Sequence, residues 1–186
     1  MNSMMKGAMF VHMIEFAQSE LGEVNTEREI QRLHLESGGA YTMVGRYPFA
    51  EFERLHHAFA RAMRIEADVF SRRLGHYVLP LLVAGRAISL DMHPFDFLEQ
   101  VHGVIHRDVR KLYQDSNPPS VRVVVRQGEQ RLVLRYESPR PMASFCGWML
   151  EATMDTFGCG DRYRIERIDA APRTEYFAEF GVDLKK

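Results

Sequence analysis

Apolar residues recur at spacings of three and four along much of the chain, a period typical of helices that bury one face. With the glycine and proline breaks, this pattern predicts helices over residues 5–21, 26–35, 49–63, 66–82, 94–113 and 141–157. Runs of β-branched and apolar residues predict strands over residues 121–125, 131–136, 163–169 and 174–182. Helices come first and a sheet with one helix follows, so the sequence predicts an α+β fold.

The predicted helix over residues 94–113 carries two histidines beside an apolar stripe. His102 and His106 are four residues apart, which is about one helical turn. Such a pair can bind a small metal ion, but the sequence offers no third ligand at a convincing spacing. The stripe consists of Leu98, Val101, Ile105, Val109 and Leu112.

A predicted strand leads directly into the segment Tyr136-Glu137-Ser138-Pro139-Arg140. On an extended backbone Tyr136, Ser138 and Arg140 share one face, because side chains alternate along a strand. That face offers two hydroxyls and a guanidinium, which together can bind carboxylates. Haem suits a protein that offers both an imidazole and a carboxylate clamp, because it carries an iron and two propionates.

Two segments together resemble the haem nitric-oxide/oxygen-binding domains, the H-NOX or HNOB family, of the stand-alone bacterial type. They are IHRDVRKLY, which contains His106, and YESPR over residues 136–140. Shorter matches in the family's order are Met5-Lys6-Gly7, Ser37-Gly38-Gly39-Ala40-Tyr41, Tyr47-Pro48, Leu74-Gly75 and Pro118-Pro119. The resemblance covers essentially the whole chain from Met5 onward.

The resemblance implies a single domain that buries haem b between a helical part, about residues 1–64, and an α+β part, about residues 65–186. It implies His106 as the proximal iron ligand, because its distance to Pro118-Pro119 matches the family. Pro119 would distort the haem, and Tyr136, Ser138 and Arg140 would bind the propionates. The residues implied to line the haem and its distal pocket are Met9, Met13, Val78, Phe145 and Met149. Contacts of His102 or His76 with this pocket stay open.

The implied distal pocket favours nitric oxide. Oxygen-binding members of the family place a tyrosine five residues after the clamp arginine, and Phe145 stands at that position here. A second position that is polar in those members corresponds to Val78. Bound dioxygen carries partial negative charge and needs a hydrogen-bond donor, whereas nitric oxide and carbon monoxide depend on one less.

Composition narrows the class of protein further. The chain has 186 residues, and its 24 basic and 25 acidic side chains give a net charge of -1. Such a balance does not predict a nucleic-acid or membrane partner. No apolar run reaches the length of a membrane span, and no signal peptide is recognised at the start. Two cysteines cannot form a four-cysteine zinc site, and they favour the cytoplasm.

The sequence therefore predicts a haem-based gas sensor, and not an enzyme, because it shows no catalytic constellation. With no effector segment recognised in the chain, it would signal by conformational change to a separate protein. The resemblance implies a histidine kinase or a cyclic-di-GMP enzyme as that partner. The alternatives are a haem-binding module for carbon monoxide or redox sensing or for haem storage, and a haem-free interaction module.

Overall fold

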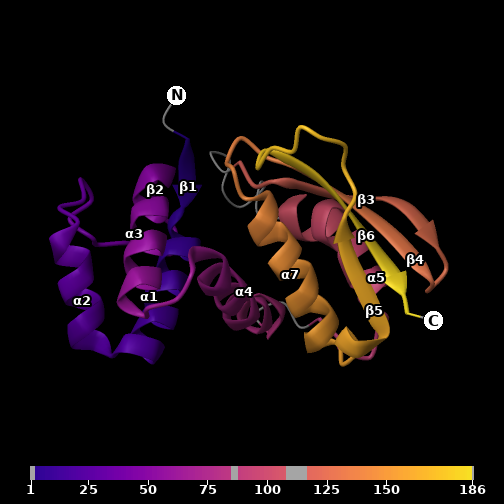
Figure 1. The fold of residues 1–186 in the computed structure, drawn as a ribbon, viewed down its shortest axis with the longest axis horizontal. Coiled ribbons are helices and arrows are strands. Elements are labelled where there is room, and N and C mark those ends of the chain that lie inside the picture. Colours follow the sequence, from indigo (N-terminus) through magenta and orange to yellow (C-terminus); the bar gives the residue numbers. More distant parts are fainter. Residues whose placement is uncertain (1–2, 85–87, 108–116, 186) are drawn as a thin grey trace. The chain divides into compact units, whose positions relative to one another are not determined.

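A computed structural model describes residues 3–84, 88–107 and 117–185 of the chain, without the side chains of His102, Val104 and Ile105. The predicted helix over residues 94–113 therefore lies partly outside the described residues. The chain divides into two compact units, Met1–Val78 and Leu79–Lys186. Each unit is described by itself (Figure 1).

The first unit is mainly helical. Its elements are β1 (Met4–Lys6), α1 (Gly7–Leu21), α2 (Glu23–Arg32), β2 (Arg46–Pro48), α3 (Phe49–Ala62) and the first part of α4 (Ala67–Ala84). Strands β1 and β2 pair antiparallel. The prediction of helix at residues 5–6 was wrong, because this segment pairs as a strand instead. The helix begins at Gly7, where a Cβ atom would lie 2.0 Å from the carbonyl oxygen of Thr42.

A single glycine separates α1 from α2. Gly22 has a φ of 80°, which few other residues adopt, and its amide donates to Gln18 O at 2.9 Å to close the end of α1. This confirms the predicted end of the first helix at residue 21. The next helix begins at Glu23, three residues before its predicted start at residue 26. Thr26 lies inside this helix, and its hydroxyl donates to Gly22 O, four residues earlier, at 2.9 Å.

A buried carboxylate holds the loop between α2 and β2. Glu51, on α3, is 4% exposed and accepts hydrogen bonds from Ser37 N, from the Ser37 hydroxyl at 2.6 Å and from the Tyr41 hydroxyl at 2.7 Å. Burial alone would raise the pKa of Glu51, but these hydrogen bonds outweigh burial and leave its pKa below the usual value. The loop is therefore fixed to α3 by a charged group whose hydrogen-bonding needs are met inside the unit.

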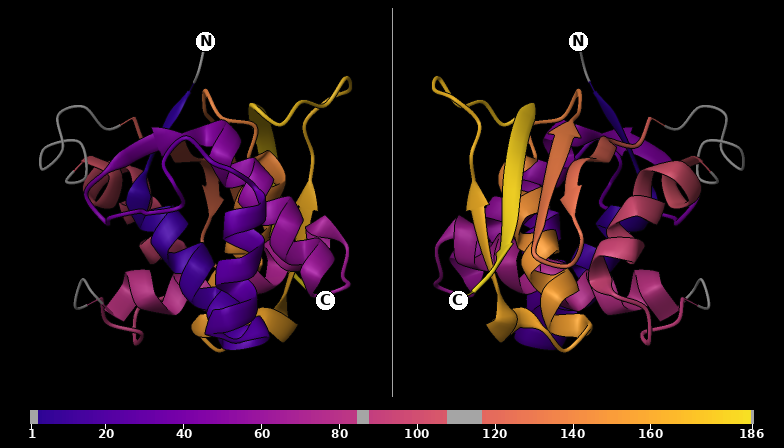
Figure 2. Two further views of the ribbon diagram at one scale, coloured as in Figure 1. Left: turned by 90° about the vertical axis from the view of Figure 1, so that its left-hand side faces the viewer. Right: turned by 90° about the vertical axis from the view of Figure 1, so that its right-hand side faces the viewer.

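The second unit is a helix-covered antiparallel sheet. Its elements after α4 are α5 (Pro94–Gln100), η1 (Val101–His106), β3 (Ser120–Gln127), β4 (Arg131–Glu137), α7 (Ala143–Thr156), η2 (Gly160–Arg162), β5 (Tyr163–Arg167) and β6 (Phe177–Leu184). The strand order is β3-β4-β6-β5, and all neighbouring pairs are antiparallel (Figure 2). Four strands behind a set of helices confirm the predicted α+β class.

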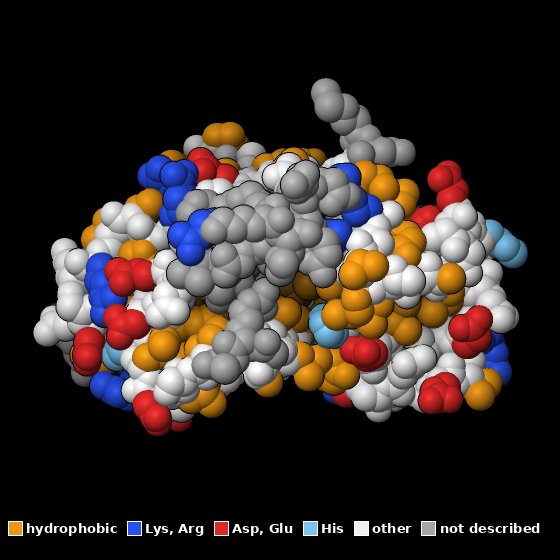
Figure 3. Space-filling model, turned by 180° about the vertical axis from the view of Figure 1, so that it is seen from behind, with side chains coloured by type: hydrophobic (Ala, Val, Ile, Leu, Met, Phe, Trp, Pro, Cys, Tyr) orange, Lys and Arg blue, Asp and Glu red, His pale blue; other side chains and the backbone are white. Residues whose placement is uncertain are grey.

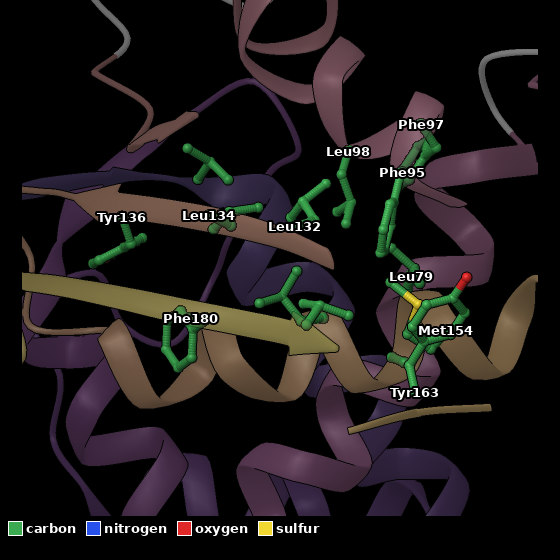
Figure 4. Packing of buried hydrophobic residues seen from close by; sticks show 14 of the residues in the cluster. Leu79, Phe95, Phe97, Leu98, Leu132, Leu134, Tyr136, Met154, Tyr163 and Phe180 are labelled. Atoms are coloured by element: carbon green, nitrogen blue, oxygen red, sulfur yellow. The ribbon is translucent and has the colours of Figure 1, made fainter. Parts of the chain in front are cut away.

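One apolar core lies between this sheet and its helices. Leu132, Leu134 and Tyr136 alternate along β4 and point towards the helices (Figure 4). Phe180 points from β6 towards α7, where a Cβ atom on Gly147 would lie 3.0 Å from its ring. Glycine at that position therefore allows α7 to approach the sheet closely.

The segment that follows α5 differs from its prediction. Residues 94–113 were predicted as one α-helix, whereas Val101–His106 forms a π-helix. The bonds of a π-helix span five residues instead of four, so the spacing of three and four that predicts one face of an α-helix does not apply within Val101–His106. The later residues of the predicted stripe, Val109 and Leu112, lie outside the described residues. Turns of this kind are frequent at functional sites.

On the face seen in Figure 3, basic, acidic and hydrophobic side chains of the described residues are interspersed. Among the described residues, no helix combines the length and the apolar character that a membrane crossing requires.

We expect the stability of the first unit to fall in mild acid because of His56. Burial and, to a smaller extent, the neighbouring His57 lower the pKa of His56 to about 4, against an opposing effect of Asp68. The unfolded chain takes up this proton near pH 6.5 and the folded chain only near pH 4, so stability is lost as pH falls through that window. His56→Gln, which can still bind the Ser71 hydroxyl, should remove up to about 3 kcal/mol of this loss in urea unfolding. Identical pH profiles for the two proteins would contradict the prediction.

Candidate functional site

His106, the candidate iron ligand, is the last residue of the π-helix η1. Its side chain is half-buried, and the Nδ1 atom of the ring is buried. The side chain of the competing His102 lies outside the described residues. The assignment of His106 as the iron ligand therefore stays a prediction.

The helix that leads to His106 is fastened to the sheet at its first turn. His93 precedes α5, and its Nδ1 accepts the amide hydrogen of Phe95 at 3.2 Å. Its Nε2 lies 3.0 Å from the hydroxyl of Tyr163 on β5, and that hydroxyl donates to the Glu129 carbonyl at 2.8 Å. This series of hydrogen bonds requires the neutral imidazole of His93 with its proton on Nε2, because Nδ1 accepts a hydrogen bond.

Ion pairs form a second contact between α5 and the sheet. Arg126 on β3 forms ion pairs at 2.7 Å with both Asp96 and Glu99, which lie one turn apart on α5. These pairs are partly exposed and contribute little stability each, but one guanidinium that meets two carboxylates fixes the helix against the strand. The register of the helix that carries η1 is thus set from β3.

The three predicted clamp residues, Tyr136, Ser138 and Arg140, come together at the end of β4. The Tyr136 hydroxyl donates to the Arg140 carbonyl at 3.2 Å, and the Arg140 amide donates to the Ser138 hydroxyl oxygen at 3.1 Å. Burial raises the pKa of Tyr136 to about 12, so its hydroxyl stays protonated as a donor at neutral pH. We call these three residues the clamp.

The clamp is not formed by strand alternation, contrary to the prediction. β4 ends at Glu137, before Ser138, and Pro139 has no amide hydrogen with which to continue the ladder. The three residues are aligned instead by their own hydrogen bonds across a tight loop.

Arg140 is 5% exposed, and its guanidinium donates to the carbonyl of Asn117. Asn117 directly precedes Pro118 and Pro119, both of which are half-buried. The clamp therefore reaches the segment that contains the predicted haem-distorting proline. Sequence reasoning missed this role of Asn117, because a backbone carbonyl leaves no signal in residue type.

Within the second unit, two neighbouring strands of the sheet connect the segment of His106 to the clamp. η1 packs on β3, and β3 pairs with β4, where Val121 stands opposite Tyr136. The donor set fits haem: an imidazole with a buried ring nitrogen, a buried guanidinium and two hydroxyls match an iron and two propionates. A hydroxyl oxygen that accepts one hydrogen bond, such as that of Ser138, can still donate its own proton.

The predicted pocket residues divide between the units. Phe145 and Met149 lie one turn apart on α7, and both are half-buried. Between them, burial raises the pKa of the Cys146 thiol to about 12, so this thiol is not a reactive nucleophile. In the first unit Met13 and Val78 are buried, whereas Met9 and His76 are half-buried. Their roles in a haem pocket stay predictions.

Tyr136→Phe should destabilise the protein by about 1 kcal/mol, because the buried Arg140 carbonyl loses one of its two donors and keeps only Met142 N, while the packing of the ring is kept. Urea unfolding measures this change. Tyr176→Phe is the matched control, since Tyr176 is 54% exposed, and it should shift stability by less than about 0.5 kcal/mol. Equal stabilities of the two variants would argue against the hydrogen bond.

Comparisons with known proteins agree with the fold and the motifs. The H-NOX protein from K. algicida, in the unliganded Fe(II) state, has 22% identity and a TM-score of 0.80, over 98% of this chain and 97% of that chain. The H-NOX from Shewanella woodyi, in the Fe(II)CO state with IWP-051 bound, has 26% identity and a TM-score of 0.80, over 97% and 95%. The H-NOX from S. oneidensis, in the Fe(II)NO state, has 18% identity and a TM-score of 0.79, over 98% and 100%.

The search of curated proteins finds no match. The sequence model of the Haem-NO-binding family, however, matches residues 6–161, which span most of the chain. The match includes His106, Pro118-Pro119 and the clamp, so the chain belongs to the Haem-NO-binding family.

Proposed function

We propose that this protein is a haem-based sensor of nitric oxide that signals by conformational change. The observation that carries the proposal is the clamp, in which a buried arginine, a buried tyrosine and a serine are bonded to one another. In a chain of the Haem-NO-binding family, a clamp of this chemistry is suited to the propionates of haem b. The proposed role is sensing, not catalysis.

Each proposed haem-binding residue contributes a separate physical role. His106 would bind the iron through an imidazole nitrogen, and Arg140 would hold a propionate with paired hydrogen bonds. Tyr136 and Ser138 would position Arg140 and add neutral donors, while Pro119 would press on the haem. Bound haem supplies an iron with an open position for a diatomic gas.

The proposed preference for nitric oxide rests on Phe145. Its side chain is apolar and half-buried at the start of α7, so it offers no hydrogen bond to a polar ligand. Nitric oxide and carbon monoxide need such a donor less than dioxygen does.

We propose that the signal leaves through the segment α5–η1. Its first turn is tied to the sheet by His93 and Arg126, whereas its last described turn holds His106. A change in the proposed bond between His106 and the haem iron would move the C-terminal end of this segment relative to its fixed N-terminal end. A partner protein that prefers one arrangement would read the change, and a histidine kinase or a cyclic-di-GMP enzyme is proposed for this role.

The proposed location is the cytoplasm. Cys146 and Cys159 are both free thiols, as a reducing compartment would keep them.

His106→Gly should abolish haem retention, and added imidazole should restore it, because the free base can occupy the position of the lost side chain. The Soret absorbance of the purified protein reports the bound haem. His57→Gly, at an exposed position on α3, is the control and should keep its haem. Loss of haem in His102→Ala and not in His106→Gly would assign the ligand to the other histidine.

Arg140→Ala should release haem about tenfold faster than wild type in transfer to apomyoglobin, because a charged hydrogen-bond donor to the propionates is lost. The matched control is Arg122→Ala, which removes an exposed ion pair with Glu137 on the neighbouring strand. Arg140→Lys keeps the charge without the planar fork and should fall between the two. Unchanged release from Arg140→Ala would remove the clamp from the proposal.

The reduced protein should keep its unliganded absorption spectrum in air and change it on addition of nitric oxide. The reason is Phe145, which offers no donor to bound dioxygen. Phe145→Tyr adds a hydroxyl at this position and should increase oxygen affinity. A stable oxygenated spectrum of the wild-type protein would refute the proposed preference.

A further inference from the structure

The loop between β5 and β6, residues 168–176, runs beside the clamp and the first turn of α7 (Figure 1). We call this loop the strap. It lies beyond residues 6–161, the stretch that the family model matches. The family match therefore does not include the contacts of the strap.

The strap holds both ends of the loop that contains Arg140. At one end, Ser138 N donates to Tyr176 O at 3.0 Å. At the other end, Ala143 N donates to Glu175 O at 3.0 Å. Arg140 lies between these two anchors, so the strap fixes the backbone from which the guanidinium projects.

The Glu175 side chain makes a third contact, with the first turn of α7. Its Oε2 accepts the amide hydrogen of Ser144 at 2.7 Å, and its Oε1 accepts from Arg167 Nη1 at 2.9 Å. The first amides of a helix have no partner within the helix, and Met142, the residue before α7, gives no side-chain cap. Glu175 supplies this cap from 31 residues away, with its negative charge at the positive end of the helix dipole.

Arg167 holds the strap in turn. Its guanidinium pairs with Asp169 at 2.8 Å, donates to Phe177 O at 2.9 Å and reaches the Thr174 carbonyl as well as Glu175. Burial alone would raise the pKa of Asp169, but the hydrogen bonds from Arg167 and from Glu179 N outweigh it and hold the pKa below its usual value. The strap is thus built around one arginine that meets two carboxylates.

We infer that Glu175, held by Arg167, is a positioning residue that fixes Arg140 in the orientation required for carboxylate binding. The carboxylates are the haem propionates, and this part of the inference rests on the proposed function. Glu175 touches neither the ligand nor the guanidinium of Arg140 in this account. It acts through the backbone between Ser138 and Ser144.

The test measures local amide exchange and haem release in the full-length protein. The variants are Glu175→Ala, which removes cap and charge, and Glu175→Gln, which keeps an acceptor for Ser144 N. The control is Asp183→Asn. This variant breaks the ion pair between Asp183, at the other end of β6, and Arg131, and both of these side chains are partly exposed. Exchange is read in both the haem-bound and the haem-free protein.

Glu175→Ala should speed the exchange of the Ser138, Ala143 and Ser144 amides by about tenfold or more, with Leu134 in the centre of β4 unchanged. Haem transfer to apomyoglobin should quicken several-fold. Glu175→Gln should lie between Glu175→Ala and wild type, and Asp183→Asn should match wild type.

Wild-type exchange at the three amides in Glu175→Ala would overturn the inference. So would faster exchange with unchanged haem transfer, and so would equal acceleration at Leu134, which would mark a general loss of stability. Wild-type protein that takes up no haem overturns the proposed function instead. In that case the exchange comparison on the haem-free chain still supports or overturns the hold of Glu175 on the loop.

Discussion

A buried guanidinium imposes the strongest constraint on the second unit. Arg140 cannot lose its proton at any ordinary pH, so the fold must bring acceptors to it. The carbonyl of Asn117 is one such acceptor, and it draws the segment before β3 towards the end of β4. The backbone of Arg140 is held as well, because its amide and carbonyl bond to Ser138 and Tyr136. A cation confined in this way is ready for an anionic ligand without further ordering.

Polar contacts and apolar contacts have different tasks in this unit. The apolar core holds α5 and α7 against the sheet, but apolar contacts alone permit small sliding. Directional contacts remove that freedom at chosen points: Arg126 and His93 at the start of α5, and Glu175 at the start of α7. Each helix is therefore fixed at its N-terminal end, and His106 lies beyond the C-terminal end of α5.

The sequence predicted what depends on local pattern. The helices at 49–62 and 143–156 and the strand at 131–137 match their predicted spans closely, because apolar periodicity reports burial directly. Strands β1 and β2 are too short to show a period, and α2 begins at Glu23, earlier than the predicted start at residue 26. The clamp residues could be named from residue type and order. The partners that hold them could not, because these are backbone carbonyls or, like Glu175, lie far along the chain.

The π-helix makes the direction of His106 depend on the hydrogen-bond pattern of the backbone. The backbone bonds of Val101–His106 span five residues instead of four, so the segment accommodates a surplus residue relative to an α-helix. If the same residues adopted ordinary α-helical bonding, the surplus residue would no longer be absorbed, and the imidazole would turn by about 100° about the helix axis. The direction of the imidazole is thus encoded by which carbonyl each amide of the segment meets, and not only by the order of the residues.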